Sequence, residues 1–373
     1  MILKNAYIYN ADFEKIRADI EVENGKIKTI GENLSGADEY DFSGCVILPG
    51  FIDIHTHGCV GYDTTGGNPE SAAKMSEWLV TNGVTSFCPT SMTIDVESLK
   101  KAFSYVADTM GNEKGAYIHG INMEGPFICE AKKGAQAAEN ILKPDIEVFN
   151  TLNSICPVKL VDIAPEVDGA IEFIKQAKEY CTVSAAHSNA TYEEGKAGID
   201  AGITHATHLY NAMPPFASRK PGLPGAVIDS EDVRAELICD GFHIAPAVLR
   251  ITMKALGEDR SIVISDSMMA AGMPDGEYSL GGQQVFVKNG DALLADGTIA
   301  GSTTNIFAEF KNLLSFGVNE KQVVKSCTIN PAKAIGADSF TGSIEEGKNA
   351  DLLVLTNDMQ SIKAVFVKGK KAI

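Results

Sequence analysis

The stretch that decides the fold is "PGFIDIHTHG", residues 49–58. It is a short apolar run that begins after Pro-Gly and ends in two histidines, His55 and His57. A run of this length between turn residues is typical of a fully buried strand. Side chains two positions apart face the same side of a strand, so both histidines are predicted to point the same way at the strand's end.

Seven further stretches repeat the pattern, separated by amphipathic segments. One of these segments, at 191–202, begins with a capping box made by Thr191 and Glu194, which predicts a helix start. The candidate strands are "GFIDIHTHG" (50–58), "VTSFCPTS" (84–91), "AYIHGINMEG" (116–125), "VKLVDIAPE" (158–166), "CTVSAAHS" (181–188), "ITHATHLY" (203–210), "RAELICDGFH" (234–243) and "SIVISDSM" (261–268). Eight strand–helix units predict an α/β protein with a (β/α)8 TIM barrel. A doubly wound open sheet is the alternative, and polar residues at so many strand ends favour the barrel.

The two ends of the chain have a different character. Residues 1–48 read as short alternating strands, with the hairpin signal "ENGK" at 23–26, and residues 345–373 have the same all-β pattern. We therefore predict one small β-sandwich domain built from both termini, 1–48 together with 345–373. The barrel domain is predicted at 49–344, with a β-hairpin insertion around 271–300.

The net charge argues against nucleic acid and membranes as partners, and the cysteines and the first residues bear on the compartment. The formal net charge is −17, which opposes binding to nucleic acid or to an anionic membrane surface. The eight cysteines form no CxxC pair and lie in apolar stretches, as expected of reduced thiols. The first residues show neither a signal-peptide pattern nor a transmembrane run. We predict a cytoplasmic protein.

Polar side chains stand at most of the predicted strand ends, where the active site of a TIM barrel lies. They are His55 and His57 on the first strand, Glu124 on the third, His187 on the fifth, His208 on the sixth, His243 on the seventh and Asp266 on the eighth. Histidine and carboxylate ligands with an open position suit a catalytic divalent ion. Any one strand-end histidine could equally be a structural residue, but Glu124, His187 and His208 together favour metal binding.

Some of these residues leave two interpretations open. His55 and His57 could hold a second ion or form a hydrogen-bonded structural pair. Asp266 ends an apolar strand and could be a helix cap, or a general base that takes a proton from the attacking water and then donates it to the leaving group. Cys59 and Cys129 also lie near strand ends, where a thiolate could approach a metal, although a small buried thiol is the commoner case.

Two other histidines have the wrong strand parity to be ligands. His119 is an odd number of positions from Glu124, and His205 is three positions from His208. We assign both to packing between the barrel and its helices.

Four stretches together resemble the N-acetylglucosamine-6-phosphate deacetylases of the amidohydrolase superfamily. They are "MEGPF" (123–127), "THLYNAMPPF" (207–216), "ICDGFHI" (238–244) and "ISDSMMAAGM" (264–273). "PGFIDIHTHG" and "GSIEEGKNADLLVL" (342–355) alone would indicate only an amidohydrolase. The resemblance covers nearly the whole chain. It implies metal-dependent hydrolysis of the acetamide of N-acetyl-D-glucosamine 6-phosphate to D-glucosamine 6-phosphate and acetate, in amino sugar catabolism or recycling.

The resemblance also implies roles for individual residues. Glu124, His187 and His208 correspond to metal ligands, Asp266 to the catalytic acid/base, and His243 to a residue that stabilises the oxyanion or binds substrate. The implied substrate-binding residues are Ala135, Gln136, Asn211, Ala212, Arg219, Asp240, Gly241, Phe242, His243, Ile299, Ala300 and Gly301. Gln136 stands where some members carry His. Arg219 offers a fork suited to phosphate oxygens, whereas Lys220 is predicted to be a solvated surface charge.

The implied cofactor is a divalent metal, with zinc expected first and iron, manganese or cobalt as alternatives. One or two ions per subunit fit the residues, and Glu124 would be the shared ligand if there are two. The family is usually a homodimer, so a dimer or a dimer of dimers is expected. Two other functions stay open: deacetylation of another N-acetyl amino sugar phosphate, such as N-acetylgalactosamine 6-phosphate, and a non-catalytic amidohydrolase-like scaffold.

Overall fold

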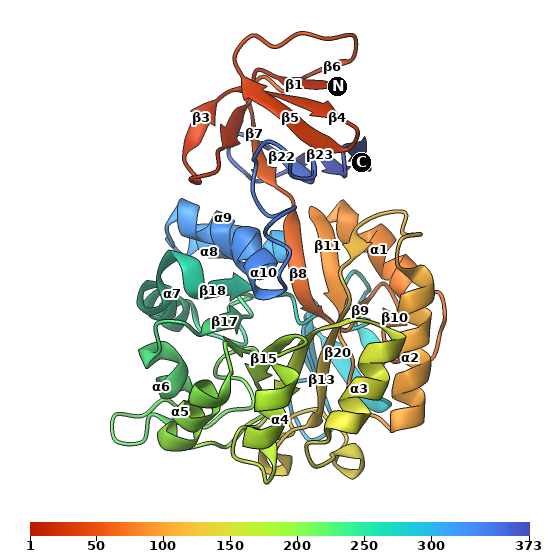
Figure 1. Cartoon of the computed structure of the whole chain (residues 1–373), viewed down its shortest axis with the longest axis vertical. Helices are drawn as coiled ribbons and strands as arrows, with labels where there is room; N and C mark the ends of the chain where they lie inside the picture. Colours follow the sequence, from red (N-terminus) through yellow and green to blue (C-terminus); the bar gives the residue numbers. More distant parts are fainter.

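Eight parallel strands form the centre of the larger unit in the computed structural model, which describes residues 1–373 (Figure 1). They are β8 (Phe51–Thr56), β11 (Val84–Pro89), β13 (Ile121–Phe127), β14 (Val158–Ile163), β15 (Thr182–Ala185), β16 (His205–Ala206), β17 (Arg234–Leu237) and β18 (Ser261–Val263). Strands β13 to β18 make one continuous sheet, and β8 pairs with β11. Parallel bridges Thr56–Ser267 and Thr90–Asn122 join the two groups. The predicted barrel is confirmed, and the open doubly wound sheet is excluded.

Helices surround the barrel, as the alternating pattern predicted (Figure 1). They are α1 (Ser71–Thr81), α2 (Val96–Thr109), α3 (Ile146–Ile155), α4 (Ala170–Ala177), α5 (Tyr192–Ala201), α6 (Gly222–Asp229), α7 (Pro246–Arg260), α8 (Ile306–Ser315), α9 (Glu320–Cys327) and α10 (Ile329–Ala334). The capping box predicted for α5 is present, because the Thr191 hydroxyl accepts the Glu194 N–H and the Glu194 carboxylate accepts the Thr191 N–H. None of the helices has the length and apolar character needed to cross a membrane.

Two packed sheets form the smaller unit, which lies at the opposite side of the barrel from its mouth (Figure 1). The strands are β1 (Ile2–Lys4), β2 (Tyr7–Tyr9), β3 (Lys15–Arg17), β4 (Asp19–Glu23), β5 (Lys26–Gly31), β6 (Glu39–Asp41), β7 (Cys45–Pro49), β22 (Leu352–Thr356), β23 (Ile362–Val367) and β24 (Lys370–Lys371). Strands β7 and β22, from opposite ends of the chain, pair antiparallel. Ile20 of one sheet and Ile47 and Phe366 of the other share a buried core. The predicted β-sandwich built from both termini is confirmed.

The turn between β4 and β5 shows why the sequence "ENGK" forms a hairpin. Asn24 and Gly25 both have positive φ, 52° and 79°, which a tight two-residue hairpin turn requires. A Cβ on Gly25 would also lie 2.8 Å from the Lys368 carbonyl oxygen, so the close approach of β23's end requires glycine there. The hairpin thus adds a second contact between the two ends of the chain, beside the pairing of β7 with β22.

The segment 271–300 contains three antiparallel strands, one more than the predicted hairpin. They are β19 (Gly276–Leu280), β20 (Gln283–Lys288) and β21 (Asp291–Leu293). The remaining short elements are β9 (Gly58–Cys59), β10 (Tyr62–Asp63), β12 (Tyr117–Ile118) and two 3-10 turns, Glu130–Lys132 and Ala138–Asn140. Because β7 ends at Pro49 and β8 begins at Phe51, we propose the domain limits 1–48 with 345–373, and 49–344.

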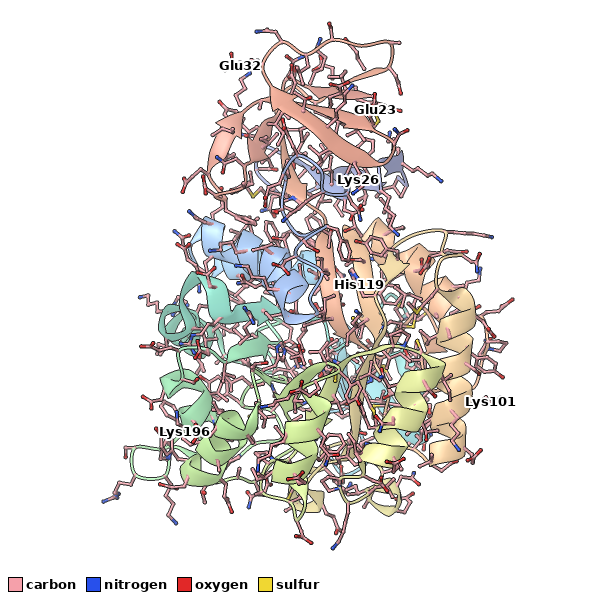
Figure 2. All side chains as sticks on the ribbon, viewed as in Figure 1. Glu23, Lys26, Glu32, Lys101, His119 and Lys196 are labelled. Carbon is pink, nitrogen blue, oxygen red and sulfur yellow. The ribbon has the colours of Figure 1, made fainter.

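His119 lies at the end of the barrel that faces the smaller unit (Figure 2). It is buried, its Nε2 is 2.9 Å from the Ser86 hydroxyl oxygen, and its ring packs against Tyr117 and Phe340. Burial lowers the pKa of His119 to about 3, so the ring is neutral at ordinary pH. His119 belongs to neither candidate ligand group, but its neighbours lie on β11, on β12 and in the loop before β22 rather than on a helix, so the predicted barrel–helix packing is not what its ring does.

Candidate metal centre

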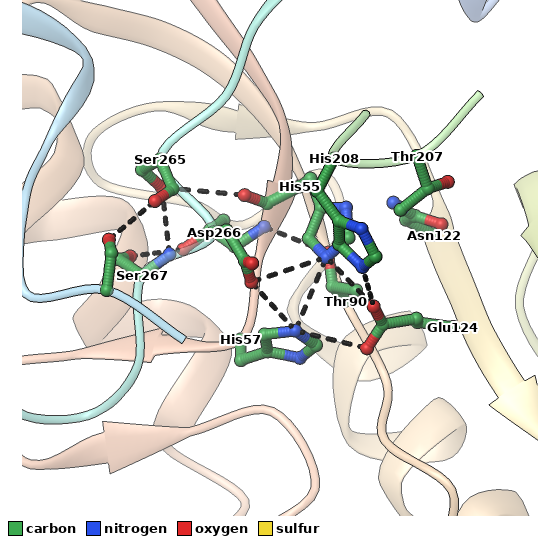
Figure 3. Close-up of polar contacts among 12 residues, drawn as sticks. His55, His57, Thr90, Asn122, Glu124, Thr207, His208, Ser265, Asp266 and Ser267 are labelled. Atoms are coloured by element: carbon green, nitrogen blue, oxygen red, sulfur yellow. Dashed lines mark hydrogen bonds and ion pairs between the residues drawn. The ribbon is translucent and has the colours of Figure 1, made fainter. Parts of the chain in front are cut away.

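Two groups of buried histidine and carboxylate side chains lie at the barrel mouth, and Figure 3 shows part of each. Within each group the candidate ligand atoms all lie within 4.8 Å of one another. The first group is Glu124, His187 and His208, and the second is His55, His57 and Asp266. All of them lie within strands of the barrel or shortly after them, so the topology itself brings them together.

The first group has the spacing of ligands around one ion. Glu124 Oε1 is 3.0 Å from Nε2 of His187 and 3.0 Å from Nε2 of His208, and the two nitrogens are 3.2 Å apart. Tetrahedral ligands with bonds of about 2.0–2.1 Å lie about 3.3–3.4 Å from one another. The donor set therefore fits a divalent ion with little rearrangement.

Backbone and hydrogen bonds aim the two histidines at Glu124. His187 and His208 have positive φ, 44° and 30°, a strained conformation that is often found at functional sites. The His187 Nδ1 is 2.9 Å from the Lys132 carbonyl oxygen, so Nδ1 carries the hydrogen and donates it. The lone pair of the His187 Nε2 is then free to bind a metal.

The second group surrounds the other side of Glu124 (Figure 3). The Nε2 atoms of His55 and His57 are 3.3 Å apart, and Asp266 Oδ1 is 3.5 Å and 3.3 Å from them. Glu124 Oε1 is 3.6 Å from His55 Nε2, and Oε2 is 3.4 Å from His57 Nε2. The Glu124 carboxylate thus lies between the two groups, where it could serve both.

Both carboxylates are held in the charged form that a cation needs. Burial by itself raises the pKa of Glu124, but the surrounding histidines, His187 foremost, outweigh it and hold the pKa well below its usual range. Burial also raises the pKa of Asp266, and His55 and His57 again bring it below the usual value. The centre combines two carboxylates with four imidazoles in a place nearly closed to solvent.

A cavity of about 220 Å³ opens onto both groups. It is lined by His57, Met92, Glu124, Gly134, Ala135, Gln136, His187, His208, Asn211, Ala212, His243, Asp266, Leu280, Thr298, Ile299 and Gly301. Leu280 belongs to the inserted three-stranded sheet, which therefore helps to wall the cavity. No lysine or arginine lines it.

The predicted substrate-binding residues divide into two sets. Those that line the cavity are Ala135, Gln136, Asn211, Ala212, His243, Ile299 and Gly301, and those that do not are Arg219, Asp240, Gly241, Phe242 and Ala300. Arg219 is exposed on the loop before α6 and does not line the cavity of its own chain. Ala300 is buried, and its N–H donates to the Ala292 carbonyl oxygen.

Asp240 does not line the cavity, but it positions His243, which does. Its carboxylate accepts hydrogen bonds from the backbone N–H groups of Phe242 and His243 and from the His243 Nδ1, at 2.8, 2.9 and 2.6 Å. These contacts fix the loop after β17 and the orientation of the His243 ring. Burial lowers the pKa of His243, but the Asp240 carboxylate outweighs it, so the pKa is raised.

Gln136 contacts a candidate ligand directly. Its Nε2 donates to Glu124 Oε2 at 2.5 Å, and its Oε1 accepts the Thr93 N–H at 2.7 Å. Because the side chain is only 2% exposed, its amide is largely committed to holding Glu124. Cys59 is buried and Cys129 is partly buried, and neither belongs to the two groups.

Sequence reasoning missed Glu236, which is fully buried on β17. Its carboxylate lies between His55 Nδ1 and His205 Nε2, each 3.0 Å away. Burial raises the pKa of Glu236, but these histidines outweigh it and lower the pKa to about 2. The assignment of His205 to packing alone was therefore wrong, because its ring forms a polar contact. A glutamate inside the apolar run "AELIC" was the available signal.

Residues 46–372 match the family model described as "Amidohydrolase family". The chain belongs to the amidohydrolase family. This amidohydrolase is 32% identical to the N-acetylglucosamine-6-phosphate deacetylase of Lysinibacillus sphaericus, with 98% of this chain and 96% of the relative covered. It is 31% identical to the N-acetylgalactosamine-6-phosphate deacetylase of Escherichia coli O157:H7, with 88% of each covered.

A solved structure of high similarity agrees with these relatives. It is a mutant N-acetyl-D-glucosamine-6-phosphate deacetylase from Mycobacterium smegmatis in complex with N-acetyl-D-glucosamine 6-phosphate. The TM-score is 0.93 at 30% sequence identity, and the match covers 100% of this chain and 99% of that one. The resemblance of this amidohydrolase to the N-acetylglucosamine-6-phosphate deacetylases is thereby confirmed.

Proposed function

We propose that the chain hydrolyses the acetamide of N-acetyl-D-glucosamine 6-phosphate to D-glucosamine 6-phosphate and acetate. The observation that carries the proposal is the Glu124–His187–His208 group, which shares one cavity with Asp266. The names of the relatives and the bound sugar phosphate of the Mycobacterium smegmatis structure support the choice of substrate.

Acetate release by the metal-replete protein tests this proposal against its alternatives. N-Acetylglucosamine 6-phosphate and N-acetylgalactosamine 6-phosphate would be compared at equal concentrations. A higher kcat/KM for the first supports the proposal, and a higher value for the second replaces it with the epimer. If neither substrate released acetate, deacetylation of both sugar phosphates would be rejected, and the non-catalytic amidohydrolase-like scaffold would be the function that remains.

In the proposed mechanism Glu124, His187 and His208 hold a divalent ion, with zinc expected before iron, manganese or cobalt. When bound, such an ion would polarise the amide carbonyl and lower the pKa of water. The ionised Asp266 accepts the proton of the attacking water and then donates it to the departing amine. The Nδ1–H of His243 is held by Asp240, and the raised pKa of His243 favours the imidazolium, whose Nε2–H donates to the oxyanion in the cavity.

We propose that His55, His57 and Asp266 form a second ion site, with Glu124 as the shared ligand. The wild-type chain is then expected to bind two equivalents of metal, and the double variant His55→Asn, His57→Asn one. Asparagine offers no imidazole nitrogen but keeps a polar side chain of moderate size. Inductively coupled plasma mass spectrometry on dialysed protein measures both values. Equal content in the two proteins would make the pair structural.

We also propose that a second copy of the chain completes the phosphate site, as expected of a homodimer or a dimer of dimers. The cavity of one chain has no cationic side chain, although the proposed substrate carries a phosphate. Arg219 is exposed. In the sequence it lies a few positions after Asn211 and Ala212, which line the cavity. Exposed Phe216, on the same loop, and Phe242, beside His243, are apolar side chains that a partner could cover.

Arg219→Ala is expected to raise KM for the phosphorylated substrate about 10- to 100-fold, since a hydrogen bond to a charged group contributes roughly 1.5–3 kcal/mol. The matched control is Lys220→Ala, which removes the neighbouring exposed cation and should leave KM nearly unchanged. Steady-state kinetics measure the effect, and sedimentation velocity reports whether a dimer forms. A monomer with unchanged KM in both variants would refute the role of Arg219.

We also propose that the protein is located in the cytoplasm. All eight cysteines are free, which suits the reducing cytoplasm. Burial raises the pKa of the thiols of Cys59 and Cys88, so these cysteines are poor nucleophiles and are suited to packing.

A further inference from the structure

Glu236 lies outside the cavity, yet it touches both groups of candidate ligands. Its Oε2 is 3.0 Å from the His55 Nδ1 and 3.3 Å from the backbone nitrogen of His208, and its Oε1 is 3.0 Å from the His205 Nε2. The side chain is fully buried on β17 and does not line the cavity. A carboxylate that can only accept hydrogen bonds therefore receives three donors at once.

The contact between Glu236 and His55 determines which ring nitrogen of His55 carries the hydrogen. Because the Glu236 carboxylate accepts, the His55 Nδ1 must carry the hydrogen, and the lone pair of Nε2 is left facing His57 and Asp266. The opposite tautomer would set a lone pair against the carboxylate and a hydrogen toward the second group. Glu236 thereby selects the form of His55 that can bind a cation.

His205 holds the Glu236 carboxylate in place. Its Nε2–H donates to Oε1, while its Nδ1 has no partner inside the barrel. With the hydrogen on Nε2, the His205 ring donates to Oε1 and leaves Nδ1 as an acceptor. With both oxygens engaged and no solvent access, the Glu236 carboxylate cannot turn away from His55.

We propose that Glu236 is a positioning residue that raises the affinity of the second ion site by fixing the tautomer and orientation of His55. The inference rests on the proposed two-ion centre. The Glu236 carboxylate is expected to matter much less for the first site, since it reaches His208 only at the backbone N–H. Removing an outer partner of a metal-binding histidine typically costs about 10- to 100-fold in metal affinity.

Two variants with different chemistry test the proposal. Glu236→Leu removes both acceptor oxygens at similar volume, whereas Glu236→Gln keeps one oxygen for the His55 Nδ1–H. Competition with a chromophoric chelator would measure the dissociation constants of Co²⁺, and the visible spectrum of the Co²⁺-loaded protein would report the ligand field. We expect the second constant to rise about 10- to 100-fold in the leucine variant and less in the glutamine variant, with the first nearly unchanged.

The matched control is Asp162→Leu, which removes another fully buried carboxyl from the barrel. Asp162 accepts a hydrogen bond from Thr207 and contacts neither group, so both Co²⁺ constants should stay as in wild type. Two ions with unchanged constants in both Glu236 variants would refute the positioning role alone. A single ion in wild type would refute the two-ion centre and this inference with it. If the leucine variant does not fold, Glu236→Ala replaces it, since alanine also removes both acceptor oxygens, and an unchanged second constant there overturns the proposal.

Discussion

Asp266→Asn is expected to lower kcat for acetate release on the order of 10²- to 10⁴-fold, the usual contribution of a general acid/base. The amide has almost the same shape as the carboxylate but cannot take a proton from water. The backbone of Asp266 is held independently of the side chain, because its N–H donates to the His55 carbonyl oxygen at 2.9 Å. The effect should therefore be chemical rather than conformational.

The measurement must separate chemistry from metal loss, because Asp266 also belongs to the second group. Metal content and kcat would be determined on the same preparation, and the variant would be assayed with excess metal. Asp162→Asn is the matched control, since it makes the same carboxyl-to-amide change at a buried position of the same barrel, where the side chain accepts a hydrogen bond from Thr207. Turnover near the wild-type value at full metal content would contradict the proposed role of Asp266.

Glu124→Gln is expected to have the largest effect on metal binding. The Glu124 carboxylate lies within 3.6 Å of four imidazole nitrogens, those of His55, His57, His187 and His208. A neutral amide cannot balance a cation and would turn N–H groups toward some of these nitrogens. Losing one partner of a buried charge pair costs about 3–5 kcal/mol, which corresponds to roughly 150- to 4,000-fold weaker binding.

Metal content after dialysis should fall at both ion sites in this variant, together with acetate release, whereas Asp266→Asn can weaken only the second ion site. Glu130→Gln is the control, because it removes an exposed carboxylate from the segment that follows the same strand. If Glu124→Gln retained two ions, Glu124 would not be the shared ligand. The contrast between the two variants distinguishes the ligand shared by both ions from the residue that moves the proton.

Local sequence patterns were sufficient for the barrel and for the members of both ligand groups. Buried parallel strands are recognised by short apolar runs, and their carboxyl ends must meet at one mouth, so His187, His208, Glu124 and Asp266 could be placed without coordinates. The spacing of His55 and His57 was sufficient to put them on one face. The strain at His187 and His208 was not visible, because a positive φ is imposed by the surrounding structure.

Contacts between distant strands were decided by the tertiary structure alone. Glu236 is 181 positions from His55, and no local period relates them, because their contact depends on the register of strands around the closed barrel. The odd spacing between His205 and His208 correctly placed His205 outside the two candidate ligand groups. It could not show that the Glu236 carboxylate contacts the His205 ring. The exposure of Arg219 likewise follows from the path of its loop rather than from its residue type. The sequence by itself determined which side chains reach the mouth, and the packing of the barrel decided which of them touch.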